Sequence, residues 1–108
     1  MNYKITNHCL ERFYERFGAT YKLKKLNMRD PGSKSVIFGT IMSAIESGSV
    51  ERSFINNLVF VTKLCDKYGY DKKYHIVQSS DRKVIFIGVL RGKTCSIVTC
   101  VDKFGNVK

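Results

Sequence analysis

The spacing of the apolar residues changes midway along this 108-residue chain, and that change constrains the fold more than any other feature. Near the N-terminus the spacing is three and four residues, which is typical of one face of an α-helix. It predicts a first helix over residues 6–18, with the apolar stripe Leu10, Phe13, Tyr14 and Phe17. Thr6 or Asn7 is the candidate N-cap and Gly18 the candidate C′ glycine.

A second helix is predicted from about Val36 to Ser47, after a basic, irregular stretch that ends in the breaker Asp30-Pro31-Gly32-Ser33. Ser35 is its candidate N-cap and Gly48 follows its end. Its expected buried stripe is Ile37, Ile41, Ala44 and Ile45.

From residue 57 onward the pattern becomes that of β-strands. Four runs are rich in Val, Ile, Phe, Tyr and Thr: Leu58–Leu64, Tyr74–Gln78, Lys83–Leu90 and Thr94–Val101. Short turn sequences, Ser79-Ser80-Asp81 and Arg91-Gly92, join the later runs. We therefore expect one α+β domain over residues 1–108, with two N-terminal helices packed on one face of a four-stranded antiparallel sheet.

The turn at Arg91-Gly92 also predicts a register. It places Leu90 opposite Lys93, Phe86 opposite Ile97 and Val84 opposite Thr99. One sheet face would then be apolar enough to receive the helices, through Val84, Phe86, Leu90, Cys95, Ile97 and Val101. The other face would be only half covered.

Nineteen Lys and Arg against nine Asp and Glu give the chain a formal net charge of +10. Such a charge concentrates polyanions, so RNA is the first expected partner, ahead of an acidic protein surface or simple solubility. Tyr68, Tyr70 and Tyr74 interleave with Lys67, Lys72 and Lys73, as base stacking and phosphate contact require. The candidate nucleic-acid-binding residues are Lys22, Lys24, Lys25, Lys67, Tyr70, Lys72, Lys73 and Lys93. Solvated lysines, and a tyrosine that covers a sheet end, are the structural alternative.

No segment has the pattern of a signal peptide or a membrane span, so the chain is expected to be cytoplasmic. The four cysteines form no CxxC pair and have no histidine at zinc-finger spacing. We expect reduced, mostly buried thiols, no metal and no cofactor.

His8, Arg12 and Arg16 recur every four residues, so they line up along one side of the first helix. A neutral imidazole beside guanidinium groups suits RNA cleavage without a metal, because the imidazole moves a proton while the cations hold a phosphate. The alternative is an ordinary helix surface, with the arginines paired to Glu11 and Glu15. His75 is a candidate second acid or base, but the favoured interpretation is a hydrogen-bonded strand histidine.

Residues Ile5–Phe17, ITNHCLERFYERF, resemble the H-A-L-E-R-x-x-E-R opening of small phage and mobile-element proteins of the DUF4258 and BrnT-like type. Those families are grouped with RelE-like toxins in the fold class of barnase, EndoU, colicin and RelE ribonucleases. This chain differs from the pattern in having Cys9 where alanine is usual, and in a basic insertion from Tyr21 to Arg29.

The resemblance implies a toxin-like, RelE-like fold that is compatible with ribonuclease activity. It makes His8 the catalytic or site-defining histidine, Arg12 and Arg16 the phosphate-facing or structural arginines, and Thr99 the polar group on the last strand. We add Arg91 as a further phosphate binder. The expected function is RNA binding with endoribonuclease activity. The alternatives are a non-catalytic phage-encoded inhibitor of a host protein, a nucleic-acid-binding interaction protein, and a toxin whose basic face is covered by an acidic antitoxin.

Overall fold

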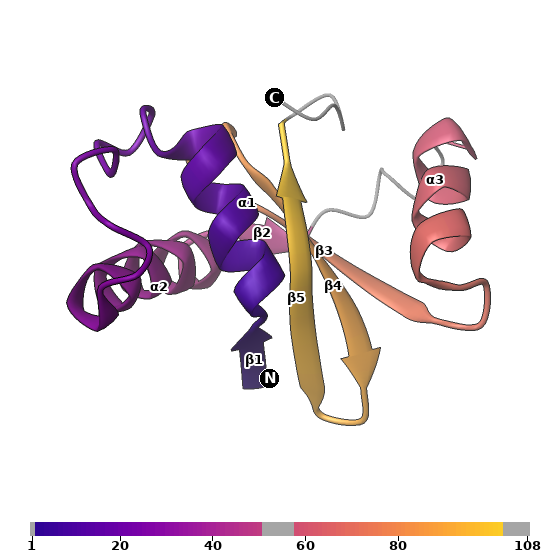
Figure 1. Cartoon of the computed structure of the whole chain (residues 1–108). Helices are drawn as coiled ribbons and strands as arrows, with labels where there is room; N and C mark the ends of the chain where they lie inside the picture. The colour runs from indigo at the N-terminus through magenta and orange to yellow at the C-terminus, as the bar shows by residue number, and fades with distance from the viewer. Residues whose placement is uncertain (1, 51–57, 103–108) are drawn as a thin grey trace.

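The computed structural model describes residues 2–50 and 58–102, which form three helices and five strands (Figure 1). In chain order the elements are β1 (Asn2–Ile5), α1 (Asn7–Phe17), α2 (Pro31–Glu46), β2 (Ser49–Val50), α3 (Leu58–Tyr68), β3 (Lys73–Gln78), β4 (Ile85–Arg91) and β5 (Thr94–Val101). The predicted α+β class is confirmed. The prediction of two helices on four antiparallel strands is wrong in its details.

The five strands form one sheet in the order β1-β5-β4-β3-β2. β1 lies parallel to β5, and Ile5 pairs with Ile97, whereas the other neighbours are antiparallel. The sheet is therefore mixed. β1 is four residues long and its partner lies more than ninety residues away in sequence, so local patterning gave no signal for this pair.

Helices cover both faces of the sheet, with α1 and α2 on one side and α3 on the other (Figure 1). The larger core combines the buried faces of α1 and α2 with one face of the sheet, through Cys9, Leu10, Phe13, Phe17, Leu23, Ile37, Ile41, Ile45, Val77, Val84, Phe86, Cys95, Ile97 and Cys100. A smaller core of Ile76, Ile85, Ile87 and Val101 lies on the opposite face, where Tyr68, Tyr74 and Val98 pack against it. The face expected to be half covered thus has its own core.

The segment predicted as the first strand, Leu58–Leu64, belongs to α3. Its β-branched and aromatic residues favour a strand only weakly, because β-propensity mostly reports how a side chain fits its surroundings. Val61, Cys65 and Tyr68 also recur at helical spacing, and Tyr68 packs on the smaller core. The tertiary contact, together with this spacing, accounts for a helix here.

The ends of α1 and α2 follow from capping. The Thr6 hydroxyl accepts a hydrogen bond from the Cys9 amide at 3.1 Å, which confirms Thr6 as the N-cap of α1. Gly18 does follow α1, but its φ of −58° is right-handed rather than that of a C′ glycine. α2 begins at Pro31, with Asp30 rather than Ser35 as its N-cap. The Asp-Pro pair that was interpreted as a breaker is a helix start.

The predicted register between β4 and β5 is wrong. Arg91 pairs with Thr94, so the two-residue turn is Gly92-Lys93, and the φ of +61° at Gly92 explains why a glycine stands there. Phe86 lies opposite Cys100 rather than Ile97, because the different turn moves the pairing by two residues and the shift between Ile87 and Gly88 moves it by one more. A shift of this kind moves the following side chains to the other face, which is why Val101 joins the smaller core.

Candidate nucleic-acid site

α1 runs along β5 beyond the point where β1 ends. The Thr6 amide donates to the Ile97 carbonyl at 3.2 Å, and the Thr6 hydroxyl donates to the same carbonyl at 3.0 Å. These bonds fix the start of α1 against the middle of β5. His8, Arg12 and Arg16 are half-exposed along one side of α1, and Arg16 contacts the last residues of β5.

Arg16 reaches from α1 to the open edge of β5. Its Nη1 donates to the Cys100 carbonyl at 2.7 Å and lies 3.4 Å from the Thr99 hydroxyl. Thr99 is buried. The structure thus brings Arg16 and Thr99 together, and it gives Arg16 a structural role because a charged donor satisfies a strand carbonyl that β1 is too short to reach.

Arg12 pairs with Glu15 at 2.8 Å across one turn of α1. Its side chain is 35% exposed and that of Glu15 57% exposed. This is the ordinary surface pair that was the structural alternative for the α1 arginines. A pair so exposed holds Arg12 loosely, so its guanidinium remains able to meet an incoming anion.

His8 stands in a cationic environment that includes a residue of α3. Partial burial lowers the pKa of His8, and the charges of Arg12, Lys67 and Arg16 lower it further, while Glu11 opposes them. Each cation disfavours a second positive charge on the imidazole. His8 is therefore neutral at pH 7, the form that can accept a proton.

Tyr68, the last residue of α3, lies near Arg16 and Thr99. The sequence did not indicate that it belongs with the α1 residues. Its hydroxyl is buried and has no hydrogen-bond partner within residues 2–50 and 58–102. Burial raises the pKa of Tyr68, while the Arg16 charge and the Thr99 hydroxyl act in the opposite direction. A buried hydroxyl with no partner requires an explanation, and a bound ligand is one.

We call the group formed by these side chains the His8 site: His8, Arg12 and Arg16 from α1, Lys67 and Tyr68 from α3, and Thr99 from β5. Only its α1 members share a pattern in the sequence. Lys67 was assigned to nucleic-acid binding for its charge, and Tyr68 was missed as a site residue because α3 was interpreted as a strand followed by a loop. Correct assignment of α3 would have placed both at one helix end.

Arg91 and Lys93 lie on the β4–β5 hairpin, at the other end of β5 from Thr99. Arg91 pairs with Thr94, and the separation of five residues from Thr94 to Thr99 spans roughly 16 Å. The assignment of Arg91 as a phosphate binder stays a prediction. His75 is also placed elsewhere, because its Nε2 lies 3.1 Å from the Tyr3 hydroxyl.

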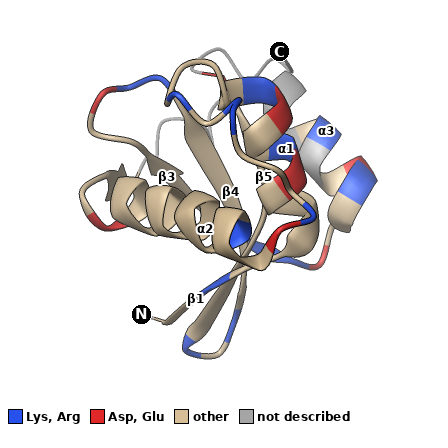
Figure 2. Cartoon of the chain, turned by 60° about the vertical axis from the view of Figure 1, so that its left-hand side comes forward, with Lys and Arg blue, Asp and Glu red and all other residues tan. Residues whose placement is uncertain are grey.

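The remaining candidate residues occupy two loops. Lys22 and Lys25 are exposed after α1, whereas Lys24 donates to the Tyr14 carbonyl at 3.2 Å and lies over the Tyr14 ring. Tyr70, Lys72 and Lys73 follow α3, and the Tyr70 hydroxyl bonds to Asp66. Figure 2 shows basic residues spread over α1, α3, the loops and the hairpin tip, while α2 is nearly uncharged.

All four cysteines are free thiols, and Cys9, Cys95 and Cys100 are buried. In the described part of the chain, no three His, Cys, Asp or Glu side chains gather as metal ligands would. Among those residues no helix has the length and apolar character needed to cross a membrane. In comparisons with known proteins, no family model, no curated protein and no solved structure matches this chain.

Proposed function

We propose that this protein binds RNA at the His8 site and cleaves it without a metal ion. The observation that carries the proposal is the convergence of α1, α3 and β5 on a group that holds one neutral histidine, whose pKa is lowered by burial and then by the charges of Arg12, Lys67 and Arg16. A neutral base next to fixed positive charge is what transfer of a phosphate between hydroxyl groups requires. The net charge of +10 supports a polyanionic substrate.

In the proposed reaction His8 takes the proton of a ribose 2′-hydroxyl. The 2′-oxygen forms a bond to the adjacent phosphorus, and the bond from phosphorus to the 5′-oxygen breaks. Arg12 and Lys67 offset the charge that grows on the non-bridging oxygens. Tyr68, held in its protonated form, is the donor that gives a proton to the leaving oxygen. The products are a 2′,3′-cyclic phosphate and a 5′-hydroxyl.

Arg16 and Thr99 act as positioning residues in this scheme. Arg16 uses one nitrogen on the Cys100 carbonyl, which ties α1 to β5 and keeps His8 opposite α3. A guanidinium has five N–H donors, so others remain for a phosphate oxygen. Thr99 lies beside Arg16 and near the Tyr68 hydroxyl.

The test incubates unlabelled cellular RNA in EDTA with wild-type protein, His8→Gln and His75→Gln. His75 is the matched control because it is the other histidine and lies outside the His8 site. We expect His8→Gln to slow cleavage by about 100-fold or more, the usual contribution of a general base, and His75→Gln to cleave at the wild-type rate. Melting temperatures of all three proteins check that the fold is intact.

Equal rates for His8→Gln and wild type would contradict the proposed base. If none of the proteins cleaves RNA, the second candidate stands, a non-catalytic RNA-binding protein on the same scaffold. The engagement of Arg12 with Glu15 and of Arg16 with Cys100 favours that candidate. RNA affinity that falls steeply with salt would support it, while salt-insensitive binding would argue against phosphate recognition altogether.

A further inference from the structure

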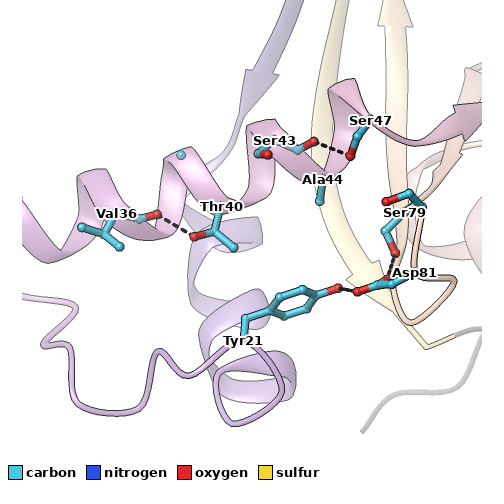
Figure 3. A pocket seen from close by; sticks show the side chains of 10 residues that line it. Tyr21, Val36, Thr40, Ser43, Ala44, Ser47, Ser79 and Asp81 are labelled. Atoms are coloured by element: carbon cyan, nitrogen blue, oxygen red, sulfur yellow. Dashed lines mark hydrogen bonds between the residues drawn. The ribbon is translucent and has the colours of Figure 1, made fainter.

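A pocket of about 510 Å³ lies between α2, the loop after α1 and the β3–β4 turn. It is lined by Tyr21, Val36, Gly39, Thr40, Ser43, Ala44, Ser47, Ser79, Ser80 and Asp81. Figure 3 shows the Tyr21 ring extending beneath α2 to Asp81, with Ala44 pointing down toward the space between them. Its volume is in the range of small-molecule sites.

The lining of this pocket differs in charge from the rest of the protein. Six of its ten residues bear hydroxyl groups, one is the carboxylate of Asp81, and none is Lys or Arg, although the chain carries nineteen of them. A phosphate would meet the negative charge of Asp81 and no cation among the lining residues, although the Lys83 charge contributes to the lowered pKa of Asp81. The pocket therefore selects against anions and for an uncharged ligand with hydrogen-bonding groups.

Asp81 is held in place by three donors and keeps room for another. Its Oδ2 accepts from the Tyr21 hydroxyl at 2.7 Å, and its Oδ1 accepts from the Ser79 hydroxyl at 2.6 Å and the Lys83 amide at 3.0 Å. A carboxylate offers about four acceptor positions, so roughly one on Oδ2 remains for a ligand donor. The turn thus presents a fixed acceptor beside an aromatic ring.

We propose that this pocket binds an uncharged nucleoside unit, with the base against the Tyr21 ring and a base amino group or ribose hydroxyl donating to Asp81. The open side of Gly39 leaves space along α2, since a Cβ there would meet nothing within 4 Å. Aromatic faces stack on bases of any sequence, and serine and threonine hydroxyls bond to base edges as donors or acceptors. The proposal does not depend on cleavage at the His8 site.

The test is an NMR titration of the full chain with adenosine, guanosine, cytidine, uridine and inorganic phosphate, following the amides of Tyr21, Thr40, Ser43 and Asp81. Gly39→Leu places a side chain in the pocket, at a position of α2 where a Cβ would meet no neighbouring atom within 4 Å. Ser35→Leu adds the same side chain to α2 outside the pocket and is the control. We expect nucleosides to shift these amides, and Gly39→Leu to weaken binding about tenfold, against less than about twofold for Ser35→Leu.

The result that overturns the proposal is an absence of amide shifts with every nucleoside, an unchanged affinity in Gly39→Leu, or displacement of the nucleoside by phosphate. A second titration with a single-stranded trinucleotide separates two sources of the same ligand. If the trinucleotide binds more tightly than the nucleosides, and Gly39→Leu weakens that binding while Ser35→Leu leaves it unchanged, the pocket holds one unit of a strand. Equal affinity for nucleoside and trinucleotide assigns it to a free nucleoside.

Discussion

The His8 site and the pocket between Tyr21 and Asp81 differ in the charge of the side chains that form them. The first gathers cations around a histidine that they keep neutral, and the second gathers hydroxyl groups around a carboxylate that they keep ionised. Burial alone would raise the pKa of Asp81, but hydrogen bonds from Ser79, the Lys83 amide and Tyr21 lower it. The two proposals therefore assign different chemical groups to the two regions, a phosphate to the His8 site and an uncharged base with its sugar to the pocket.

Different contacts hold the two regions together. The His8 site depends on contacts between whole elements, with Arg16 joining α1 to β5 and Tyr68 bringing in α3. The pocket depends on local geometry, a tight turn on one side and the small residues of α2 on the other. Substitutions at matched positions can test each kind of support separately.

The largest expected effect is on the pocket side, at the end of α2. A Cβ on Gly48 would lie 2.3 Å from the Gln78 carbonyl oxygen and 2.9 Å from that of Ala44, and neither backbone group can move freely. We expect Gly48→Ala to lower the free energy of unfolding by roughly 3 kcal/mol, measured by urea denaturation. Gly39→Ala, in open space in the same helix, is the control and should raise it by about 0.5 to 1 kcal/mol. Equal effects of the two would mean that α2 does not end against β3.

The next effect concerns the two arginines of α1. Arg16→Ala removes the charged donor to the Cys100 carbonyl and should lower the free energy of unfolding by about 2 kcal/mol. Arg12→Ala removes only an exposed pair with Glu15 and should lower it by less than about 0.5 kcal/mol. Urea denaturation of both variants measures the difference. Similar losses would show that Arg16 does not anchor the helix to the strand.

Features that lie within a single helix or strand could be predicted from the sequence. The apolar stripe of α1, its Thr6 cap and the alignment of His8, Arg12 and Arg16 follow from helix geometry alone. Strands β3, β4 and β5 were located from their composition and their turns. These features depend on neighbours in sequence, so local patterning could predict them.

The parts that depend on distant contacts were not predictable in this way. β1 is defined by its parallel partner β5, and α3 has a strand-like composition that its packing on the smaller core overrides. The shift at Ile87/Gly88 moved Val101 to the other face. The pocket combines three segments whose residues share no motif, and Tyr68 entered the His8 site only once α3 was known to be a helix.

Tyr21 provides a smaller test of the pocket. Burial, followed by the hydrogen bond to Asp81, raises the pKa of Tyr21 above its ordinary value of 10.0. The folded protein then holds a proton that the unfolded chain releases above about pH 10, so the free energy of unfolding should fall as pH rises through that range. Tyr21→Phe should cost about 1 kcal/mol at pH 7 and reduce the alkaline fall.

Urea denaturation at pH 7 and pH 11 measures both quantities. Tyr70→Phe is the control, because Tyr70 is 74% exposed and also bonds to a carboxylate, that of Asp66. The bond to Asp66 also raises the pKa of Tyr70, but solvent screens this exposed pair, so Tyr70→Phe should change the alkaline profile less than Tyr21→Phe does. If Tyr21→Phe matches the wild type at both pH values, the Tyr21–Asp81 bond does not define the wall of the pocket.

The smallest expected change is a displacement of one titration curve, and it tests how the His8 site is assembled. The pKa of His8 is lowered by burial and then by the charges of Arg12 and Lys67, whereas burial alone lowers the pKa of His75. Lys67→Met should therefore raise the pKa of His8, because it removes a positive charge that opposes protonation, and leave that of His75 unchanged. NMR titration of the two imidazoles reports both values in one experiment.

Lys63→Met, an exposed change in the same helix, is the control and should leave both curves in place. Added salt should raise the pKa of His8 toward 6.5 in the wild type, since exposed charges are screened, and should affect His75 less. Because Lys67 belongs to α3 and His8 to α1, the response to Lys67→Met depends on the two helices meeting at the edge of β5. If the pKa of His8 responds to Arg12→Met but not to Lys67→Met, His8 interacts only with its own helix. In that case α3 does not contribute to the proposed RNA site.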